Sequence, residues 1–410
     1  MTGADLLLVR FAEIGIKRGN RKRFTRALAD RIRETTEAFG AVRSVRPTHS
    51  RILVELDPDA PAVARRRVLE RLTDTPGVHT VSPAHRVAAD MEALAAAVAD
   101  RAEQIVARRN PATFRITCSR SDKRFPLTSD EIARELGGAV LARCPGLRVQ
   151  LKGADLEIGV EIATLQHAYV YAERLPGPGG VPVGTAGGVV HLLSGGFDSP
   201  VAGSLLQVRG CELTPIYFHS FPLVGDAARE KVIDLARILS RRQRRMQLGV
   251  VGFTEVQTTL RDRCPADLLV VLYRRMMLRV ADAIAERLGF DAVSTGDALS
   301  QVASQTLPNL RTIQAVCSRP VLRPLLACNK EQIIDTSRRL GMFEISARRA
   351  DDCCSLFVPR HPRTRARIEH AERAERGLDI PALVAQCLER TEWIELSCGR
   401  VCEPEDAPRA

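Results

Sequence analysis

The sequence predicts an α/β protein in which two small α+β blocks precede a larger block built on a parallel sheet. Three observations predict this fold class. From Val189 onward, nearly continuous apolar strands alternate with helices, which is typical of a parallel sheet covered on both faces. Before Arg174, strands and helices alternate in two shorter blocks. Between these regions, the tract RLPGPGGVPVGTAGG is dense in proline and glycine, which indicates a linker over residues 175–188.

The first block covers residues 1–86 and carries a concentrated positive charge. Its expected elements are the strand LLLVRF (6–11), the helix 20–38, the strand RILVEL (51–56), the helix 61–72 and the strand GVHTVSPA (77–84). Eight lysine and arginine side chains fall between Ile16 and Arg33. They form either a solvated helix face or a surface that follows phosphates, and the charge pattern alone leaves both open.

The second block covers residues 87–174. Its expected elements are the helix 90–108, the strand ATFRITCS (112–119), a helix that starts near residue 129, and the strands ADLEIGVEI (154–162) and HAYVYAER (167–174). Thr128 or Ser129 can cap the second helix, and acidic residues follow in its first turn, where they favour the helix dipole.

The third block covers residues 189–395, and residues 396–410 form a tail. Four buried strands are expected, namely VVHLL (189–193), ELTPIYF (212–218), MQLGVVGF (246–253) and DAVSTG (291–296), with helices over 199–209, 227–237 and 265–288. The region from residue 362 is expected to be mainly helical and polar. Ligands of such sheets bind at the carboxyl ends of the strands, where SGGFDS, HSFP and GDALSQ fall.

The stretch SGGFDS (194–199) has the features of a phosphate-binding loop. Its glycines allow close approach of the backbone, and the following helix offers free N–H groups to an anion. Ser194 and Ser199 add hydroxyl donors, whereas Asp198 would repel a bare phosphate and is expected to act through Mg²⁺. The alternative is a tight strand-to-helix turn that is capped by Ser199 and binds nothing.

This loop resembles the PP-loop, SGGxDS, of the ATP pyrophosphatases. The resemblance implies an adenine nucleotide α-hydrolase-like domain whose loop cradles the pyrophosphate of ATP while AMP is transferred to an oxygen. The loop contains no lysine. That absence fits the resemblance, because the γ-phosphoryl group is not the group transferred.

The whole chain, roughly residues 5 to 390, resembles the tRNA 4-thiouridine synthetases, a family of tRNA uracil 4-sulfurtransferases that also serve thiamine thiazole formation. The segments that carry the resemblance are RFAEIGIKRGNRKRF (10–24), RSDKRFPLTSDEIARELG (120–137), GPGGVPVGTAGGVVHLLSGGFDSPVAG (177–203), TGDALSQVASQTLPNL (295–310), RPVLRPLLACNKEQII (319–334) and DDCCSLFVPRHPRT (351–364). Ala12 stands where the family usually has glycine. The first two blocks are then expected to be a ferredoxin-like domain and a THUMP RNA-binding domain.

The resemblance implies specific roles for individual residues. The nucleotide site is expected to comprise Leu192, Leu193, Ser194, Gly195, Gly196, Asp198, Ser199, Tyr217, Phe218, Arg274, Gly296 and Gln305. Arg275 is the alternative to Arg274 if the register differs by one residue. RNA contacts are expected at Lys17, Arg21, Lys22, Arg120, Lys123 and Arg124.

Eleven cysteines occur in the chain, and the resemblance points to Cys354 as the sulfur carrier. A persulfide-bearing cysteine must be accessible and readily form a thiolate, and Arg348, Arg349, Arg360 and His361 make this stretch electropositive. Some relatives end in a rhodanese domain, and we expect the shorter subtype without it. Sulfur would then arrive directly from a cysteine desulfurase, or through Cys353 or another local thiol. Cys398 and Cys402 have no assigned role.

The composition agrees with an anionic partner. The net charge is +11, from 60 basic and 49 acidic residues. No run of about 18 apolar residues occurs and the N-terminus lacks the features of a signal peptide, so no membrane is involved and a cytoplasmic location is expected. The expected substrates and partners are ATP, Mg²⁺, tRNA, a cysteine desulfurase and a thiamine sulfur-carrier protein. A homodimer stays open, since the sequence does not fix the oligomeric state.

Two other functions are consistent with parts of the pattern. One is an amide-forming synthetase that uses the same loop, and the other is an RNA-binding protein with an inactive nucleotide pocket. The first would not need Cys354, and the intact SGGFDS loop disfavours the second.

Overall fold

The structure is a computed structural model, and it describes the chain except for residues 1–3, 351–356, 358, 360 and 403–410. The chain divides into two compact units, Met1–Gly180 and Val181–Ala410. The boundary falls within the predicted linker. Hydrogen bonds tie the two sides of this linker to different units: Gly179 N donates to Val78 O (2.8 Å), and Val181 N donates to Val208 O (3.1 Å).

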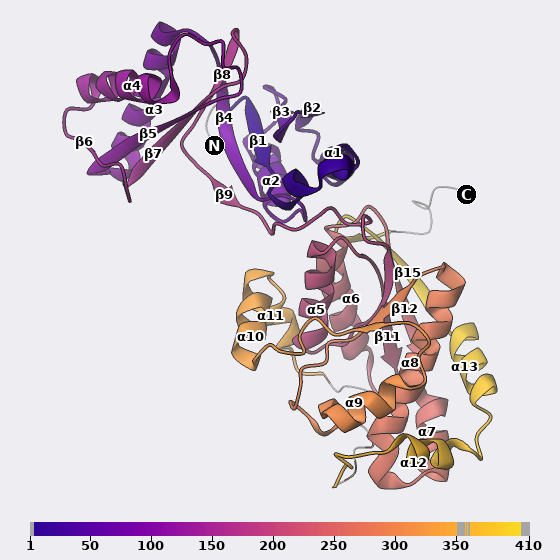
Figure 1. The fold of residues 1–410 in the computed structure, drawn as a ribbon. Helices are drawn as coiled ribbons and strands as arrows, with labels where there is room; N and C mark the ends of the chain where they lie inside the picture. Colours follow the sequence, from indigo (N-terminus) through magenta and orange to yellow (C-terminus); the bar gives the residue numbers. More distant parts are fainter. Residues whose placement is uncertain (1–3, 351–356, 358, 360, 403–410) are drawn as a thin grey trace. The chain divides into compact units, whose positions relative to one another are not determined.

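The N-terminal unit is built on one nine-stranded sheet with the order β2-β3-β1-β4-β8-β7-β5-β6, in which β9 also pairs with β4 (Figure 1). The strands are β1 (Leu6–Arg10), β2 (Val42–Pro47), β3 (Arg51–Leu56), β4 (Thr80–Ala88), β5 (Thr113–Arg120), β6 (Arg148–Val149), β7 (Leu156–Ile162), β8 (His167–Tyr171) and β9 (Leu175–Pro176). The helices are α1 (Arg21–Thr36), α2 (Ala62–Thr73), α3 (Met91–Arg109) and α4 (Ser129–Arg143), with short 3₁₀ turns η1 (Glu13–Ile16), η2 (Arg18–Asn20) and η3 (Glu37–Phe39).

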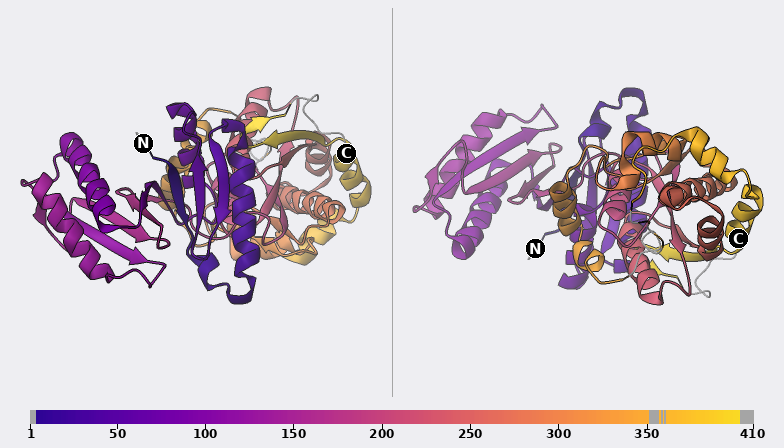
Figure 2. Two further views of the ribbon diagram at one scale, coloured as in Figure 1. Left: turned by 90° about the horizontal axis from the view of Figure 1, so that it is seen from above. Right: turned by 90° about the horizontal axis from the view of Figure 1, so that it is seen from below.

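The two predicted N-terminal blocks share this sheet through the long strand β4. Residues 80–84 of β4 pair with β1, and residues 84–88 pair with β8. Each block nevertheless has its own hydrophobic core, the first around Leu28 and Leu72 and the second around Leu94 and Leu136. The helices α3 and α4 cover the second half of the sheet, as the two views of Figure 2 show. Of the two caps that the sequence left open, Thr128 rather than Ser129 caps α4, and it forms a capping box with Glu131.

The C-terminal unit contains a seven-stranded sheet with the order β14-β13-β10-β11-β12-β15-β16. The strands are β10 (Gly188–Leu192), β11 (Glu212–His219), β12 (Met246–Gly252), β13 (Ala292–Ser294), β14 (Val321–Leu322), β15 (Glu392–Ser397) and β16 (Arg400–Val401). The helices are α5 (Asp198–Val208), α6 (Asp226–Ser240), α7 (Thr254–Arg263), α8 (Leu269–Leu288), α9 (Leu307–Gln314), α10 (Lys330–Arg339), α11 (Phe343–Ser346), α12 (Ile368–Glu375) and α13 (Ile380–Glu389), with 3₁₀ turns η4 (Ala266–Leu268) and η5 (Ala303–Gln305).

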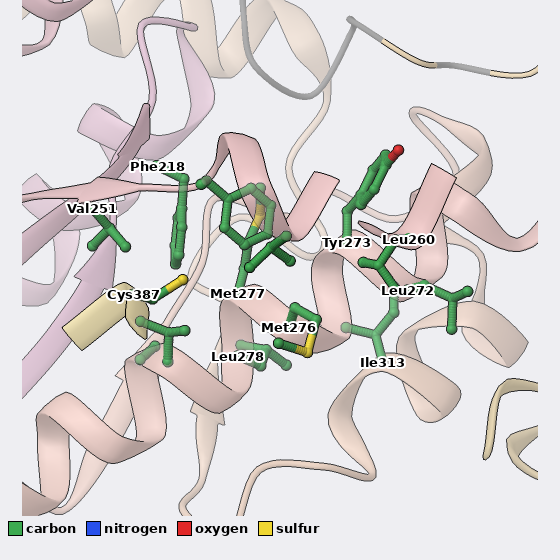
Figure 3. Close-up of a cluster of buried hydrophobic side chains, with 14 of the residues drawn as sticks. Phe218, Val251, Leu260, Leu272, Tyr273, Met276, Met277, Leu278, Ile313 and Cys387 are labelled. Atoms are coloured by element: carbon green, nitrogen blue, oxygen red, sulfur yellow. The ribbon is translucent and has the colours of Figure 1, made fainter. Parts of the chain in front are cut away.

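The strands from β14 to β12 are parallel and are covered on both faces, as predicted. The core on one side includes α6 residues such as Leu235, and the core on the other side is dominated by α8, whose side chains Met276, Met277 and Leu278 appear in Figure 3. The expectation of a mainly helical C-terminal region was wrong for β15 and β16. The stretch EWIELS (392–397) pairs antiparallel with β12 near the edge of the sheet, with Leu396 buried and Glu392 and Trp393 exposed.

One buried ionic cluster fastens α12 to α8. The Glu375 carboxylate accepts hydrogen bonds from Arg275 (2.9 and 2.8 Å) and from Arg279 (2.8 and 2.8 Å). Burial raises the pKa of Glu375, but the two guanidinium groups lower it more strongly, to about 2. The carboxylate therefore stays ionised at neutral pH and balances two positive charges inside the unit.

We expect Glu375→Gln to lower the free energy of unfolding by about 3–5 kcal/mol, because it leaves two largely buried guanidinium groups without a counter-charge. The control is Glu255→Gln, which breaks an exposed pair with Arg390 and should cost less than about 1 kcal/mol. Urea unfolding monitored by the fluorescence of Trp393, the one tryptophan, reports on this unit. Equal losses in the two variants would contradict a structural role for the cluster.

Candidate active site

The loop between β10 and α5 is held in shape by its own two serines. Ser194 N donates to Ser199 Oγ (2.8 Å), and the two hydroxyl groups lie 3.1 Å apart. The helix α5 begins at Asp198, and none of the side chains that the structure describes caps it. Its first N–H groups are therefore available to an anion, as the phosphate-loop interpretation requires.

Gly296, just after β13, approaches this loop closely. A Cβ atom at Gly296 would lie 2.6 Å from both the N and the Cα of Ser199, a distance at which backbone atoms would have to move. Only glycine fits there. The family resemblance placed Gly296 in the nucleotide site, and the structure shows that it lies against the start of α5.

A buried histidine links β10 to β13 and to the start of α5. His191 on β10 is fully buried; its Nδ1 lies 2.7 Å from Ser294 Oγ on β13, and its Nε2 lies 2.8 Å from Ser199 O on α5. Burial lowers the pKa of His191 to about 4, so the imidazole is neutral at physiological pH. The side chain connects the loop helix to the sheet and was not predicted as part of the site.

A pocket of about 180 Å³ opens at the carboxyl ends of β10, β11 and β13. Ten residues predicted for the nucleotide site line it: Leu192, Leu193, Ser194, Asp198, Ser199, Tyr217, Phe218, Arg274, Gly296 and Gln305. Gly195 and Gly196 belong to the adjoining loop without lining the pocket. Met277, Thr295 and Asp297 also line it and were missed by the sequence analysis.

Asp297 organises the polar wall of this pocket. Its carboxylate forms an ion pair with Arg274, accepts a hydrogen bond from Thr295 Oγ1 (2.6 Å), and lies 3.3 Å from Arg323 Nε. Burial raises the pKa of Asp297, but the charges of Arg274 and Arg323 and the Thr295 hydroxyl outweigh it and leave the pKa below its usual range. Gln305 Nε2 also approaches Asp297 Oδ1, at 3.4 Å.

Two polar atoms beside Asp297 have unused hydrogen-bonding capacity. Gln305 Oε1 and Arg323 Nη2 are buried, and neither has a hydrogen-bond partner within the described parts of the chain. Because buried polar groups are usually satisfied and Gln305 lines the pocket, its Oε1 indicates a polar ligand there.

The structure also distinguishes between the two neighbouring arginines of α8. Arg274 lines the pocket, whereas Arg275 is buried against Glu375 and donates to Thr312 O (2.7 Å). Of the two, Arg274 can therefore face a ligand in this pocket.

Lysines from distant segments lie beside the loop, which has none of its own. Lys330, the first residue of α10, pairs with Asp198 (2.8 Å), and Gln301 donates to the same carboxylate (2.9 Å). Lys231 on α6 passes close to Gly195 and donates to Arg348 O (2.8 Å). The sequence analysis missed both lysines because they lie 32 or more positions away from the loop.

The side chains of Tyr217 and Phe218 pack in different hydrophobic cores. The Tyr217 side chain packs in the core on the α6 side and the Phe218 side chain in the core on the α8 side, and they are 2% and 4% exposed. Both were expected in the nucleotide site, where either the ring or the backbone could contact a ligand. Their burial favours backbone contact.

Three of the residues predicted to contact RNA take part in the protein's own loops. Arg21 donates to His49 O, Arg120 donates to Phe125 O and Leu127 O, and Arg124 pairs with Asp122 (2.8 Å). The turn at residues 48–51 connects the two predicted segments, because Arg51 reaches Ser121 Oγ (3.3 Å).

The three remaining candidates for RNA contact are lysines near the same two segments. Lys22 and Lys123 are exposed, and Lys17 Nζ lies 5.3 Å from the ring centroid of Phe24. The turn at residues 48–51 thus contacts both segments that hold the six predicted residues.

Cys353 and Cys354 lie outside the described residues, but the chain on both sides is described. Before them, Ser346 Oγ donates to Gly196 O (3.2 Å). Cys398 lies in the turn between β15 and β16 with a φ of 48°, and Cys402 N donates to Glu395 O (2.9 Å). Within the described ranges, no cluster of His, Cys, Asp and Glu suits a metal ion, and no helix is long and apolar enough to span a membrane.

Comparison with known proteins identifies the family. Residues 184–380 match the family model "Thiamine biosynthesis protein (ThiI)", residues 6–82 match the ThiI ferredoxin-like domain, and residues 88–173 match the THUMP domain. A probable tRNA sulfurtransferase of Moorella thermoacetica is 43% identical over 94% of this chain and 96% of its own length. A protein of the same name from Brevibacillus brevis is 40% identical over 96% of each chain.

Solved structures agree with this relationship. A 4-thiouridine synthetase in complex with RNA and bound ATP superposes with a TM-score of 0.86 at 32% identity, over 96% of this chain and 100% of that chain. PH1313 from Pyrococcus horikoshii gives a TM-score of 0.63 at 27% identity, over 82% and 99% of the two chains. The chain belongs to the ThiI family, and both the family resemblance and the predicted fold class are confirmed.

We expect Gly296→Ala to weaken ATP binding at least about tenfold, because the added methyl group must displace the backbone at Ser199. The matched control is Gly252→Ala, at the end of β12, where a Cβ atom would meet only ordinary contacts with Arg390 at 3.8 Å or more. Calorimetric titration with ATP measures both variants. Wild-type affinity in Gly296→Ala would show that the close approach is not required.

We expect His191 to make the C-terminal unit lose stability as the pH falls from about 6.5 to about 4. In this window the unfolded chain binds a proton that the folded chain excludes, because the folded pKa is lowered. A shift of this size corresponds to a loss on the order of 3 kcal/mol at the acidic end. His191→Gln, which does not titrate, should flatten this part of the stability profile in urea unfolding. Parallel profiles for the two proteins would contradict the assignment.

Proposed function

We propose, from its membership of the ThiI family, that this chain is an ATP-dependent tRNA sulfurtransferase that converts uridine at position 8 of tRNA to 4-thiouridine. The names of its relatives support the reaction class. The observation that carries the proposal is the pocket at the strand ends, where the Ser194–Ser199 loop meets Arg274 and Asp297. A loop that presents free helix N–H groups beside a guanidinium suits a polyphosphate.

We assign the nucleotide contacts as follows. The backbone and hydroxyl groups of Ser194–Ser199 hold the pyrophosphate part of ATP, and Arg274, oriented by Asp297, stabilises the charge that develops on it. Gln305 Oε1 and Arg323 Nη2 supply further polar contacts to the nucleotide. The main chain at Tyr217 and Phe218 borders the adenosine.

Mg²⁺ is compatible with the residues present. Asp198 is a half-buried carboxylate at the start of α5, and Mg²⁺ is usually held by one or two carboxylates together with substrate phosphates. When bound, the ion would neutralise phosphate charge. Lys330 holds Asp198 in position and adds a second positive charge near the loop.

The proposed chemistry has two stages. The uracil O4 attacks the α-phosphorus of ATP, the bond to pyrophosphate breaks, and O4 becomes part of a good leaving group. The terminal sulfur of a persulfide on Cys354 then attacks C4, and AMP departs with O4. A second thiol cleaves the bond between the two sulfurs and leaves 4-thiouridine together with a protein disulfide. Cys353 is one candidate for this thiol.

The remaining assignments are proposals of the same kind. Lys17, Arg21, Lys22, Arg120, Lys123 and Arg124 contact tRNA phosphates. A cysteine desulfurase supplies the persulfide, and a sulfur-carrier protein of thiamine synthesis is a second acceptor. The homodimer, the cytoplasmic location and the domain limits 1–86, 87–174, 175–188 and 189–395 stay predictions.

We expect Cys354→Ser to abolish 4-thiouridine, with a loss of at least about 100-fold, because serine cannot carry a persulfide. Mass spectrometry of tRNA nucleosides from a deletion strain complemented with each variant measures it. The control is Cys118→Ser, since burial raises the pKa of the Cys118 thiol to about 11 and makes it unreactive. Retained 4-thiouridine in Cys354→Ser would overturn the assigned role, and its absence with the wild type would overturn the reaction.

A further inference from the structure

The short helix α9 lies between two segments that the proposed reaction needs. On one side is the loop from Gly296 to Gln305, which contributes three residues to the pocket. On the other side are residues 363–366, which follow the cysteine-bearing stretch along the chain. Side chains of α9 bind the backbone of both segments.

Asn309 makes the central connection. Its side chain is fully buried, and Nδ2 donates to Ala303 O (2.7 Å) in the pocket loop and to Arg363 O (2.7 Å) in the other segment. Its Oδ1 accepts a hydrogen bond from Ala366 N (2.8 Å). One amide group therefore joins two stretches of backbone that are 60 residues apart in sequence, and all three bonds have good geometry.

Two threonine hydroxyl groups, one on α9 and one at its N-cap, bind residues 363–366 but not the pocket loop. Thr312 Oγ1 donates to Ala366 O (2.8 Å), and Thr306 Oγ1, at the N-cap of α9, donates to Thr364 O (2.6 Å). Arg275 donates to Thr312 O (2.7 Å), which ties α9 to the rigid helix α8. Residues 363–366 are therefore attached to α9 and, through α9, to α8.

The chain before the cysteines is attached to the Ser194–Ser199 loop and to α6 beside it. Ser346 Oγ donates to Gly196 O (3.2 Å), and the rings of Phe343 and Phe197 lie 5.3 Å apart. Lys231, whose stem passes Gly195, donates to Arg348 O (2.8 Å). Both flanks of the cysteine-bearing stretch thus bind directly to segments that form the nucleotide pocket.

We propose that Asn309 is a positioning residue that couples the nucleotide pocket to the cysteine-bearing stretch, so that the state of the pocket sets the reactivity of Cys354. This inference rests on the proposed function for the role of Cys354, but the coupling can be measured without tRNA. Binding that shifts the pocket loop at Ala303 is transmitted through Nδ2 to Arg363, and binding that shifts Gly196 is transmitted through Ser346 to the other flank.

The test measures the rate at which iodoacetamide alkylates Cys354 in the full-length chain, with and without a non-hydrolysable ATP analogue, by peptide mass spectrometry. The other ten cysteines serve as internal references. In the wild type, the analogue should change the rate for Cys354 at least about threefold and leave Cys118 unchanged. Asn309→Ala, which removes both connections, should abolish that change.

Thr312→Val keeps the test decisive if Asn309→Ala fails to fold. Valine has nearly the shape of threonine and removes only the bond to Ala366 O, so it should reduce the ATP effect while the analogue still binds. Its kcat for 4-thiouridine should fall about tenfold or more with KM for ATP within about twofold, because misplacement of a reacting group lowers kcat. The control is Thr258→Val on α7, whose hydroxyl bonds only within its own helix.

Two results would overturn the proposal. One is an alkylation rate in the wild type that the ATP analogue does not change. The other is an ATP effect of wild-type size in both folded variants. If the ATP effect is present and the variants abolish it, but no 4-thiouridine forms with any protein, then the coupling holds and only the proposed reaction fails.

Discussion

The active end of the C-terminal unit depends on how closely the backbone after β13 approaches the start of α5. At Gly296 no side chain fits, and the His191 ring contacts both Ser294 on β13 and Ser199 on α5. Because Asp297 follows directly, the close approach carries a buried carboxylate to the rim of the phosphate loop. Asp297 in turn orients Arg274 and Arg323. A single glycine therefore determines where the positive charges of the pocket lie.

Much of the fold could be predicted because its signals are local. Continuous apolar strands, the Pro- and Gly-rich tract and the cap at Thr128 each occupy a few adjacent positions. Two features were not predicted, since both depend on pairing between distant segments. The strand β4 joins two blocks into one sheet, and β15 returns to pair with β12. Short strands such as EWIELS carry too little periodicity to be separated from helix by sequence alone.

The site shows the same division between local and distant information. The residues of the loop were predicted from its motif, and those at the strand ends from the resemblance to a known family. Lys330, Lys231 and His191 were missed, because their importance comes from partners 8 to 132 positions away. The loop carries an aspartate and no lysine, and the fold brings the balancing charge from α10. A loop motif therefore describes the backbone that holds an anion, whereas the charges around it come from the tertiary structure.

The sulfur chemistry is restricted by the environments of the other cysteines. Burial raises the pKa of six thiols, and the affected residues are Cys118, Cys144, Cys211, Cys264, Cys317 and Cys387. A raised pKa keeps these thiols protonated at neutral pH, and a protonated thiol neither attacks a persulfide nor carries one efficiently. These six cysteines are therefore poorer candidates for the proposed sulfur transfer than an accessible thiol of low pKa. Cys353 and Cys354 lie outside the described residues, but the chain on either side of them is hydrogen-bonded near the pocket, Ser346 to the loop at Gly196 and Arg363 to Asn309 of α9. This attachment agrees with the proposed transfer of sulfur at that pocket.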